Sequence, residues 1–264
     1  MNQRVRFQQL HQKDEVLFLP NAWDLLSAIV LEQTGFKAIG TTSWGMANAM
    51  GFKDGERVGF DDLLSSVAKM VAAVAVPVTV DIESGYGDDV AEVVENVLKV
   101  AGLGAAGINI EDSFKRTTGL RDRREHGTWL SRIRSELDKR GFADFFINAR
   151  IDTYFQLDNP LEETIERARE YAAGGADGIF VPGVSALDDI GEIVRSVDKP
   201  LNVMSLPNMT EVAALERIGV KRFSIGNALS DATVSFVERR ARAIFETRNT
   251  ADLYLESRVQ TVFQ

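Results

Sequence analysis

The sequence predicts a (β/α)8 barrel, an α/β fold in which eight parallel strands alternate with helices. Two observations support this: short apolar runs recur along the 264 residues, and amphipathic stretches separate them. The apolar runs are "VLFLP" (16–20), "KAIG" (37–40), "VPVTVDI" (76–82), "AGINIE" (106–111), "DFFINARI" (144–151), "DGIFVP" (177–182), "KPLNVMS" (199–205) and "VKRFSI" (220–225). An open doubly wound sheet would show the same alternation. However, no G-x-G-x-x-G motif opens a helix after the first strand, so the barrel is favoured.

The helices of the predicted barrel are marked by amphipathic patterns and by glycine at their ends. The clearest stretches are "DDLLSSVAKMVAAV", "AEVVENVLKVAGL" and "PLEETIERAREYAAGG". Glycine follows in "TGF", "GLG", "AAGGAD" and "RIGV", where a left-handed residue usually ends a helix. We therefore expect residues 1–264 to form one barrel domain.

The segment after the last predicted strand, residues 227–264, is long enough for two helices rather than one. Its first helix carries an apolar stripe, composed of Val234, Val237, Ala241, Ile244 and Phe245. An extra apolar helix at the end of a barrel is expected to be buried on another subunit. The sequence thus predicts a homo-oligomer with these C-terminal helices in the interface.

Composition excludes several classes of protein. There is no cysteine, which excludes disulfides, thiolate zinc sites and a cysteine nucleophile. The net charge of −9 and a pI near 4.9 argue against nucleic-acid binding. No apolar run is long enough to span a membrane, and the polar N-terminus lacks a signal-peptide core. We expect a cytoplasmic protein with no membrane or nucleic-acid partner.

Polar side chains gather at the carboxyl ends of three consecutive predicted strands. Because side chains alternate along a strand, these residues are expected to point inward together. They are Asp81 and Glu83, then Asn109 and Glu111, then Asn148, Arg150 and Asp152. Active sites of such barrels form at this end. Clustered carboxylates without histidine or cysteine suit Mg²⁺, with Mn²⁺ as its usual substitute, and Arg150 would favour an anionic substrate.

Two loops at the same end are candidate parts of the site. The stretch "GTTSWGMANAMGFKDGE" (40–56) offers hydroxyls and backbone N–H groups that can hold a carboxylate, and Asp54 could reach the metal. The loop 112–127 is long and charged, and is expected to close over the site. Its Ser113, Glu125 and His126 are candidate acids or bases, although a solvated His126 is the simpler expectation. His11 is expected at the surface.

At these residues the sequence resembles the isocitrate lyase/phosphoenolpyruvate mutase superfamily. The matching segments are "LPNAWDLLSA", "GTTSWGMANAMGFKDGE", "VTVDIESGYGDD", "GINIED", "INARIDTY" and "GADGIFVPG", in family order from about residue 16 to 230. The resemblance implies a (β/α)8 barrel that binds Mg²⁺ and an α-oxo acid or its enolate. It also implies a C-terminal helix that is exchanged between subunits, often in a tetramer built as a dimer of helix-swapped dimers.

The resemblance also implies roles for single residues. Asp81 would be the direct metal ligand, and Glu83, Glu111 and Asp54 would hold metal-bound waters. The substrate's carboxylate and oxo groups would be bound by Thr42, Ser43 and the backbone at Trp44, and Arg150 would contact the substrate. Asn202 and Ser205, in "NVMSLPN" (202–208), are candidates for contact with the distal part of the substrate.

Departures from the family pattern narrow the expected reaction. The isocitrate and methylisocitrate lyases carry a cysteine in a "K-[KR]-C-G-H" loop, which this chain lacks. The phosphonopyruvate-handling members have "E-D-K", where this chain has Ser113. The resemblance therefore implies a Mg²⁺-dependent lyase that cleaves a C–C bond of a small 2-oxo or 2-hydroxy carboxylate through an enolate. The alternatives are a mutase or hydrolase acting on a C–P bond, and an inactive oxo-acid-binding protein.

Overall fold

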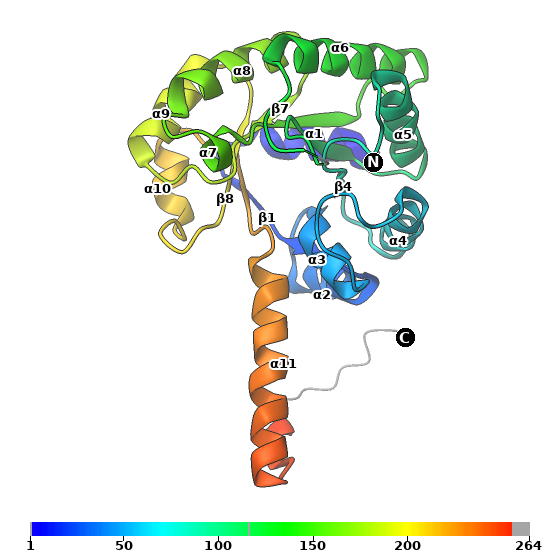
Figure 1. Cartoon of the computed structure of the whole chain (residues 1–264), viewed down its shortest axis with the longest axis vertical. Coiled ribbons are helices and arrows are strands. Elements are labelled where there is room, and N and C mark those ends of the chain that lie inside the picture. Colours follow the sequence, from blue (N-terminus) through cyan, green and yellow to red (C-terminus); the bar gives the residue numbers. More distant parts are fainter. Residues whose placement is uncertain (1, 116, 255–264) are drawn as a thin grey trace.

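The structure, a computed structural model, describes residues 2–115 and 117–254, and it confirms the predicted (β/α)8 barrel (Figure 1). Within those residues one sheet holds nine parallel strands in the order β1-β9-β8-β7-β6-β5-β4-β3-β2. The strands are β1 (Leu17–Leu19), β2 (Asn21–Ala22), β3 (Ile39–Thr41), β4 (Val78–Asp81), β5 (Gly107–Glu111), β6 (Phe146–Arg150), β7 (Gly178–Phe180), β8 (Leu201–Met204) and β9 (Arg222–Ser224). All eight predicted strands are present.

The ninth strand arises because the first predicted strand is broken in two. Pro20 stands between β1 and β2, and proline has no N–H to donate to a neighbouring strand. Leu17 pairs with Arg222 of β9, whereas Asn21 pairs with Gly40 of β3. The barrel closes across this break, since the two halves of one strand bind the two ends of the sheet.

Helices surround the barrel (Figure 1). They are α1 (Gln3–His11), α2 (Leu25–Thr34), α3 (Ser43–Ala49), α4 (Phe60–Ala73), α5 (Val90–Gly102), α6 (Arg123–Lys139), α7 (Thr153–Gln156), α8 (Leu161–Ala173), α9 (Leu187–Ser196), α10 (Val212–Arg217) and α11 (Ala228–Thr247). Aspartates begin three of them: Asp24, Asp89 and Asp122 each accept a hydrogen bond from a backbone N–H of the first turn. Among the helices so described, none is both long and apolar enough to cross a membrane.

The alternation of side chains divides the interior into two environments. Outward residues such as Val80 and Ile108 pack against the helices in a large apolar core. Inward residues are polar in the middle of the barrel, where Asn148 and Arg222 are buried. A small apolar cluster, which includes Phe7 of α1, closes the opposite end. The fold therefore directs the polar residues toward one end of the barrel.

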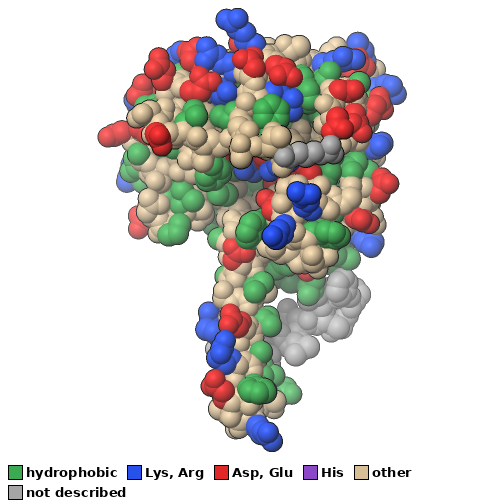
Figure 2. Space-filling model, viewed as in Figure 1, with side chains coloured by type: hydrophobic (Ala, Val, Ile, Leu, Met, Phe, Trp, Pro, Cys, Tyr) green, Lys and Arg blue, Asp and Glu red, His purple; other side chains and the backbone are tan. Residues whose placement is uncertain are grey.

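Helix α11 projects away from the barrel and confirms the predicted extra helix (Figures 1 and 2). Its apolar stripe is exposed: Val234 is 67% exposed, Val237 58% and Phe245 85%. A short 3-10 turn, η1 (Ala251–Leu253), follows. Residues 255–264, where the sequence predicted the rest of a second helix, lie outside the part that the structure describes.

Three expectations, about the loop, His126 and His11, were wrong. Helix α6 begins at Arg123, so the predicted loop 112–127 ends at Asp122 and His126 lies within the helix. His126 is buried against Tyr171, with the ring centroids 4.7 Å apart. His11 is also buried and stacks on Phe146 at 4.2 Å. Burial lowers the pKa of each imidazole to about 3, so both rings are neutral.

Candidate active site

A pocket of about 220 Å³ opens at the carboxyl ends of the strands. The structure brings six of the predicted site residues to its wall: Thr42, Ser43, Trp44, Asp54, Asp81 and Arg150. They come from the ends of β3, β4 and β6 and from the segment after α3. Residues from distant parts of the sequence thus meet at the end of the barrel where active sites form.

The turn after β3 is held in place by hydrogen bonds and close packing. Thr42 caps α3, and its Oγ1 accepts a hydrogen bond of 3.3 Å from the N–H of Gly45. A Cβ on Gly45 would lie 2.8 Å from both Thr42 and Trp23, so only glycine fits there. Ser43 donates its hydroxyl to Asp81 at 3.1 Å. The turn is therefore tied to the carboxylate at the end of β4.

Two of the predicted metal ligands are paired with a lysine. The Nζ of Lys115 lies 3.2 Å from Glu83 and 2.6 Å from Glu111. Burial raises the pKa of Glu83 and of Glu111, and the ammonium group opposes that shift. Glu83 also accepts hydrogen bonds from the Tyr86 hydroxyl and from the N–H of Glu56. Neither glutamate lines the pocket, so both lie behind Asp81 rather than beside it.

Arg150, at the end of β6, is fixed by two acids. Its Nε and Nη2 donate to the two oxygens of Asp152 at 2.6 and 3.2 Å, and its Nη1 lies 2.9 Å from Glu111. Burial opposes the charged form, but Glu111 and Asp152 hold the pKa of Arg150 well above its usual value. The pocket therefore has a permanent cation in its wall.

Asp54 and Asp81 leave carboxylate oxygens with spare capacity at the same pocket. Among the residues described, the buried Oδ1 of Asp54 has no hydrogen-bond partner. The Asp81 carboxylate accepts one hydrogen bond on each oxygen, from Ser43 at 3.1 Å and from the N–H of Glu83 at 3.3 Å, so both oxygens keep lone pairs. Over the same residues no three histidine, aspartate or glutamate side chains form a ready cage. Mg²⁺ needs only one or two carboxylates because it keeps its waters, so this pair fits it.

Three other predicted site residues do not border the pocket. Ser113 is buried and donates its hydroxyl to Asp152 at 2.6 Å. Asn202 is buried beneath the pocket and binds Ser224 at 2.7 Å. Ser205 does not line it, whereas Met204 does. The alternation explains this difference, since Met204 shares the inward face of Asn202 and Ser205 falls on the other face.

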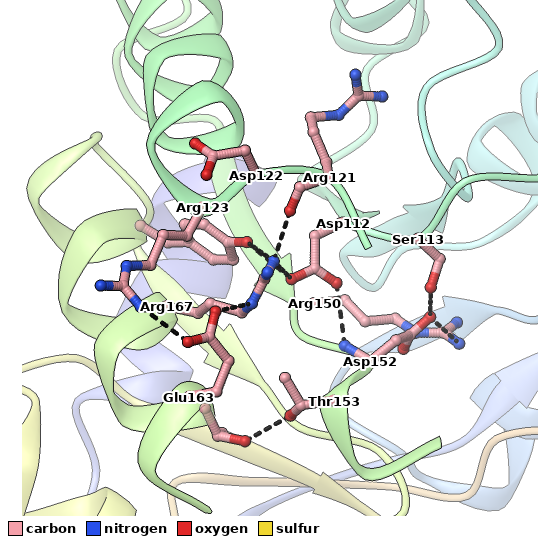
Figure 3. A network of polar contacts seen from close by, with 12 residues as sticks. Asp112, Ser113, Arg121, Asp122, Arg123, Arg150, Asp152, Thr153, Glu163 and Arg167 are labelled. Atoms are coloured by element: carbon pink, nitrogen blue, oxygen red, sulfur yellow. Dashed lines mark hydrogen bonds and ion pairs between the residues drawn. The ribbon is translucent and has the colours of Figure 1, made fainter. Parts of the chain in front are cut away.

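Sequence reasoning missed a second charged cluster on the outer side of β5, which we call the outer cluster: Asp112, Glu163, Arg167 and Tyr171. Figure 3 shows Arg167 between Asp112 and Glu163. The Asp112 carboxylate accepts three hydrogen bonds: from the Arg167 guanidinium at 2.9 Å, from the Tyr171 hydroxyl at 2.7 Å and from the N–H of Asp152 at 3.1 Å. It thereby anchors the backbone of the residue that fixes Arg150. The only signal for it in the sequence was the acid pair "ED".

Comparisons with known proteins agree with this architecture. A family model described as phosphoenolpyruvate phosphomutase matches residues 7–245. An uncharacterised protein from Mycobacterium tuberculosis is 36% identical over 241 residues, 91% of this chain and 89% of that protein. A 2-methylisocitrate lyase from Shewanella oneidensis is 31% identical over 214 residues, 78% of this chain and 70% of that enzyme.

A solved structure shares the fold at lower identity. A phosphonopyruvate hydrolase in complex with oxalate and Mg²⁺ matches with a TM-score of 0.86, at 21% identity, over 96% of this chain and 90% of that chain. At this identity the likeness shows the fold alone.

Proposed function

Because the chain belongs to the phosphoenolpyruvate phosphomutase family, we propose that it is a Mg²⁺-dependent lyase. Its substrate would be a small 2-oxo or 2-hydroxy carboxylate, in which it breaks a C–C bond and leaves an enolate. The matched relatives named as lyases support this class of reaction. The observation that carries the proposal is the pocket itself, which joins two carboxylates, a half-buried arginine and a hydroxyl-bearing turn.

Asp81 and Asp54 would hold the magnesium ion, since both line the pocket and both have oxygens to spare. When bound, the ion would supply positive charge that stabilises the developing enolate. A phosphonopyruvate hydrolase of the same fold was solved with Mg²⁺ and oxalate, an analogue of that enolate, and these two ligands are therefore the probes chosen for this pocket.

The chain's own residues would bind and orient the substrate. Arg150 would bind a carboxylate oxygen, because its guanidinium is charged and already held in one orientation. The Thr42–Ser43 turn would bind the other oxygen of the same carboxylate. Lys115 and the loop that carries it would cover the glutamates behind Asp81 and exclude water. His126 is removed from the list of proton donors, since it is buried in α6.

The alternative reaction is rearrangement or hydrolysis of a C–P bond, which the family's own description favours. Ser113 argues against it, because its hydroxyl binds Asp152 where the phosphonopyruvate-handling members have a lysine. Oxaloacetate, alkylmalates and phosphonopyruvate should be supplied in turn with Mg²⁺, and the products followed by proton and phosphorus NMR. Cleavage of an alkylmalate or of oxaloacetate supports the lyase. Phosphate or phosphoenolpyruvate from phosphonopyruvate supports the alternative, and oxo-acid binding without product indicates an inactive binding protein.

The assembly we propose is a homo-oligomer in which α11 packs on another subunit. The support is the exposed stripe of α11, where Val234, Val237 and Phe245 are each more than half exposed (Figure 2). Exposed apolar faces of this kind usually mark interaction surfaces. Light scattering of the purified protein tests this directly, because a monomer at micromolar concentration would contradict it.

A further inference from the structure

We propose that Asn109 is a substrate-binding residue whose amide N–H groups bind an anionic oxygen at the floor of the pocket. We assign Arg222, which lies beneath it, the role of the positioning residue that turns this amide toward the ligand. The inference rests on the proposed function in one respect: the ligand is taken to be the same small carboxylate.

Arg222 occupies an unusual position inside the barrel. It is 0% exposed, and within the described residues its Nε and Nη1 have no hydrogen-bond partner. Burial lowers its pKa, and this effect outweighs the charge of Asp81, which favours the cationic form. Its Nη2 donates to Oδ1 of Asn109 at 3.2 Å. A guanidinium can only donate hydrogen bonds. The atom of Asn109 that faces it must therefore be the amide oxygen.

A second set of contacts fixes the same orientation independently. Asn202 donates its Nδ2 to two backbone carbonyls, those of Val203 at 2.8 Å and of Arg222 at 3.3 Å, so its Oδ1 must accept. Oδ1 of Asn202 accepts a hydrogen bond of 3.1 Å from Nδ2 of Asn148. The same Nδ2 also donates to Oδ1 of Asn109 at 2.9 Å. The backbone carbonyls at Asn202 and the Arg222 guanidinium at Asn109 thus fix the orientation of the side-chain amides between them.

The consequence is a pair of unused donors at the pocket. Asn109 lines the pocket and is 5% exposed, and its Nδ2 donates to nothing in residues 2–115 and 117–254. Nδ2 of Asn109 is unpaired among these residues but not wholly buried, so it is open to the pocket. A metal-bound water mainly donates hydrogen bonds and is a weak acceptor, so it is a poor partner for these N–H groups. Their natural partner is an oxygen of the ligand, and an anionic oxygen binds them most strongly.

The position and charge of these groups suit the same ligand. Asn109 pairs in register with Asp81 on the neighbouring strand, so the free N–H groups lie beside the proposed metal ligand. Burial lowers the pKa of Arg222 to about 9, which leaves it charged at neutral pH. A cation beneath the floor further favours an anion above it.

The primary test is Asn109→Asp, with oxalate binding measured by calorimetry in Mg²⁺ and again in EDTA. The carboxylate can still accept from Arg222 and Asn148, but it offers no donor to the pocket and repels an anion. We expect oxalate to bind roughly 30- to 100-fold more weakly under both conditions, without a lower melting temperature. Thr79→Val is the matched control, since Thr79 is equally buried and does not line the pocket, and it should leave the affinity unchanged. Unchanged oxalate affinity in Asn109→Asp overturns the inference.

The role of Arg222 is tested with a double-mutant cycle of Asn109→Leu and Arg222→Met. Arg222→Met alone should weaken oxalate binding about tenfold, because the Asn109 amide can then rotate. In the Asn109→Leu background the same change should cause no further loss of affinity. Arg222→Lys should restore most of the affinity, because an ammonium also only donates. If Arg222 is only structural, Arg222→Met should lower the oxalate affinity equally in the wild type and in Asn109→Leu. That result would overturn the positioning role.

A crystal structure of the unaltered protein with oxalate keeps the inference testable if the variants fold poorly. An oxalate oxygen about 3 Å from Nδ2 of Asn109 supports it, and a nearest ligand oxygen beyond about 4 Å overturns it. If the wild-type protein binds no oxalate, the inference also fails. If oxalate binds through Asn109 but no substrate turns over, only the proposed function fails.

Discussion

Glu111 and Asp112 are neighbours in the sequence, yet they belong to two different charged clusters. Glu111 points into the barrel toward Lys115 and Arg150, at the rear of the pocket. Asp112 points outward into the outer cluster (Figure 3). Alternation along β5 sends the two carboxylates to opposite faces of one strand. Two carboxylates thus meet different environments one position apart.

The difference between the two clusters lies in what remains unpaired. In the outer cluster, no polar side-chain atom of Asp112, Glu163, Arg167 or Tyr171 is among the unpaired buried atoms of the described chain. At the pocket, by contrast, Oδ1 of Asp54 is unpaired. Closed networks stabilise a fold, whereas open polar groups in a pocket await a ligand. We therefore expect changes in the outer cluster to alter stability and changes at the pocket to alter binding.

The largest expected effect is on stability, from Arg167→Met. This change leaves Asp112 buried without its cation, which should lower the free energy of unfolding by about 3–5 kcal/mol. Oxalate affinity of the folded fraction should change little. Urea denaturation measures the first quantity and calorimetry the second. Arg169→Met, on the exposed side of α8, is the control and should cost less than about 0.5 kcal/mol. Equal stability of the two variants would contradict the division.

The next effect is a pH dependence that originates beside the outer cluster. His126 packs on Tyr171 near Arg121 and Arg167, and its pKa falls from 6.5 to about 3. Below pH 6.5 the unfolded chain takes up a proton that the folded chain refuses. Stability should therefore fall by about 1.4 kcal/mol per pH unit for this group, or about 2 kcal/mol at pH 5. At pH 7.5 the penalty is absent.

His126→Phe tests this pH dependence, because neither ring nitrogen has a partner in the part of the protein described. The variant should match the wild type at pH 7.5 in urea denaturation and exceed it by about 2 kcal/mol at pH 5. The same loss of stability on acidification in both proteins would show that His126 is not held neutral.

A smaller effect, on metal binding, should follow from Lys115→Met. The Lys115 ammonium now neutralises Glu83 and Glu111, which lie behind the proposed ion. Removing this like charge should strengthen Mg²⁺ binding about tenfold and make the stability more dependent on Mg²⁺. Calorimetric titration of Mg²⁺ into the two proteins measures the change, with the exposed Lys53→Met as control. Weaker binding in Lys115→Met would show that the lysine supports the ion instead.

The smallest effect on the single chain is expected from Phe245→Asp in α11. Phe245 is 85% exposed, so its loss should alter the stability of a monomer by less than about 0.5 kcal/mol. In an oligomer built through α11 the buried charge should instead cause dissociation, seen by light scattering as a lower mass. An oligomer of unchanged mass would place the interface elsewhere.

The sequence predicted the strands and the direction of their side chains because both depend on local pattern. Period-two alternation brought Asp81, Asn109 and Arg150 to the same end of the barrel, and the structure has them around one pocket. It also explains why Ser205 is absent from the pocket wall. The break at Pro20 could have been foreseen, since proline cannot donate within a sheet.

What the sequence did not predict depends on distant contacts. Nothing local marks Lys115 as the partner of both Glu83 and Glu111, because the loop must first fold back on the barrel. His126 was placed in a loop, and only the tertiary packing of α6 against Tyr171 shows that it is buried. Arg222 was predicted to lie in a strand, but its burial without an acid of the described residues at ion-pair distance follows only from closure of the barrel.

The central claim is that the spare carboxylate oxygens at the pocket bind a magnesium ion beside a small oxo acid. Calorimetry of oxalate binding to Asp81→Asn, with and without Mg²⁺, tests it most directly. We predict that Mg²⁺ strengthens oxalate binding to the wild type and to the exposed control Asp61→Asn, and that this gain is lost in Asp81→Asn while its stability is maintained. An equal gain from Mg²⁺ in all three proteins would contradict the account.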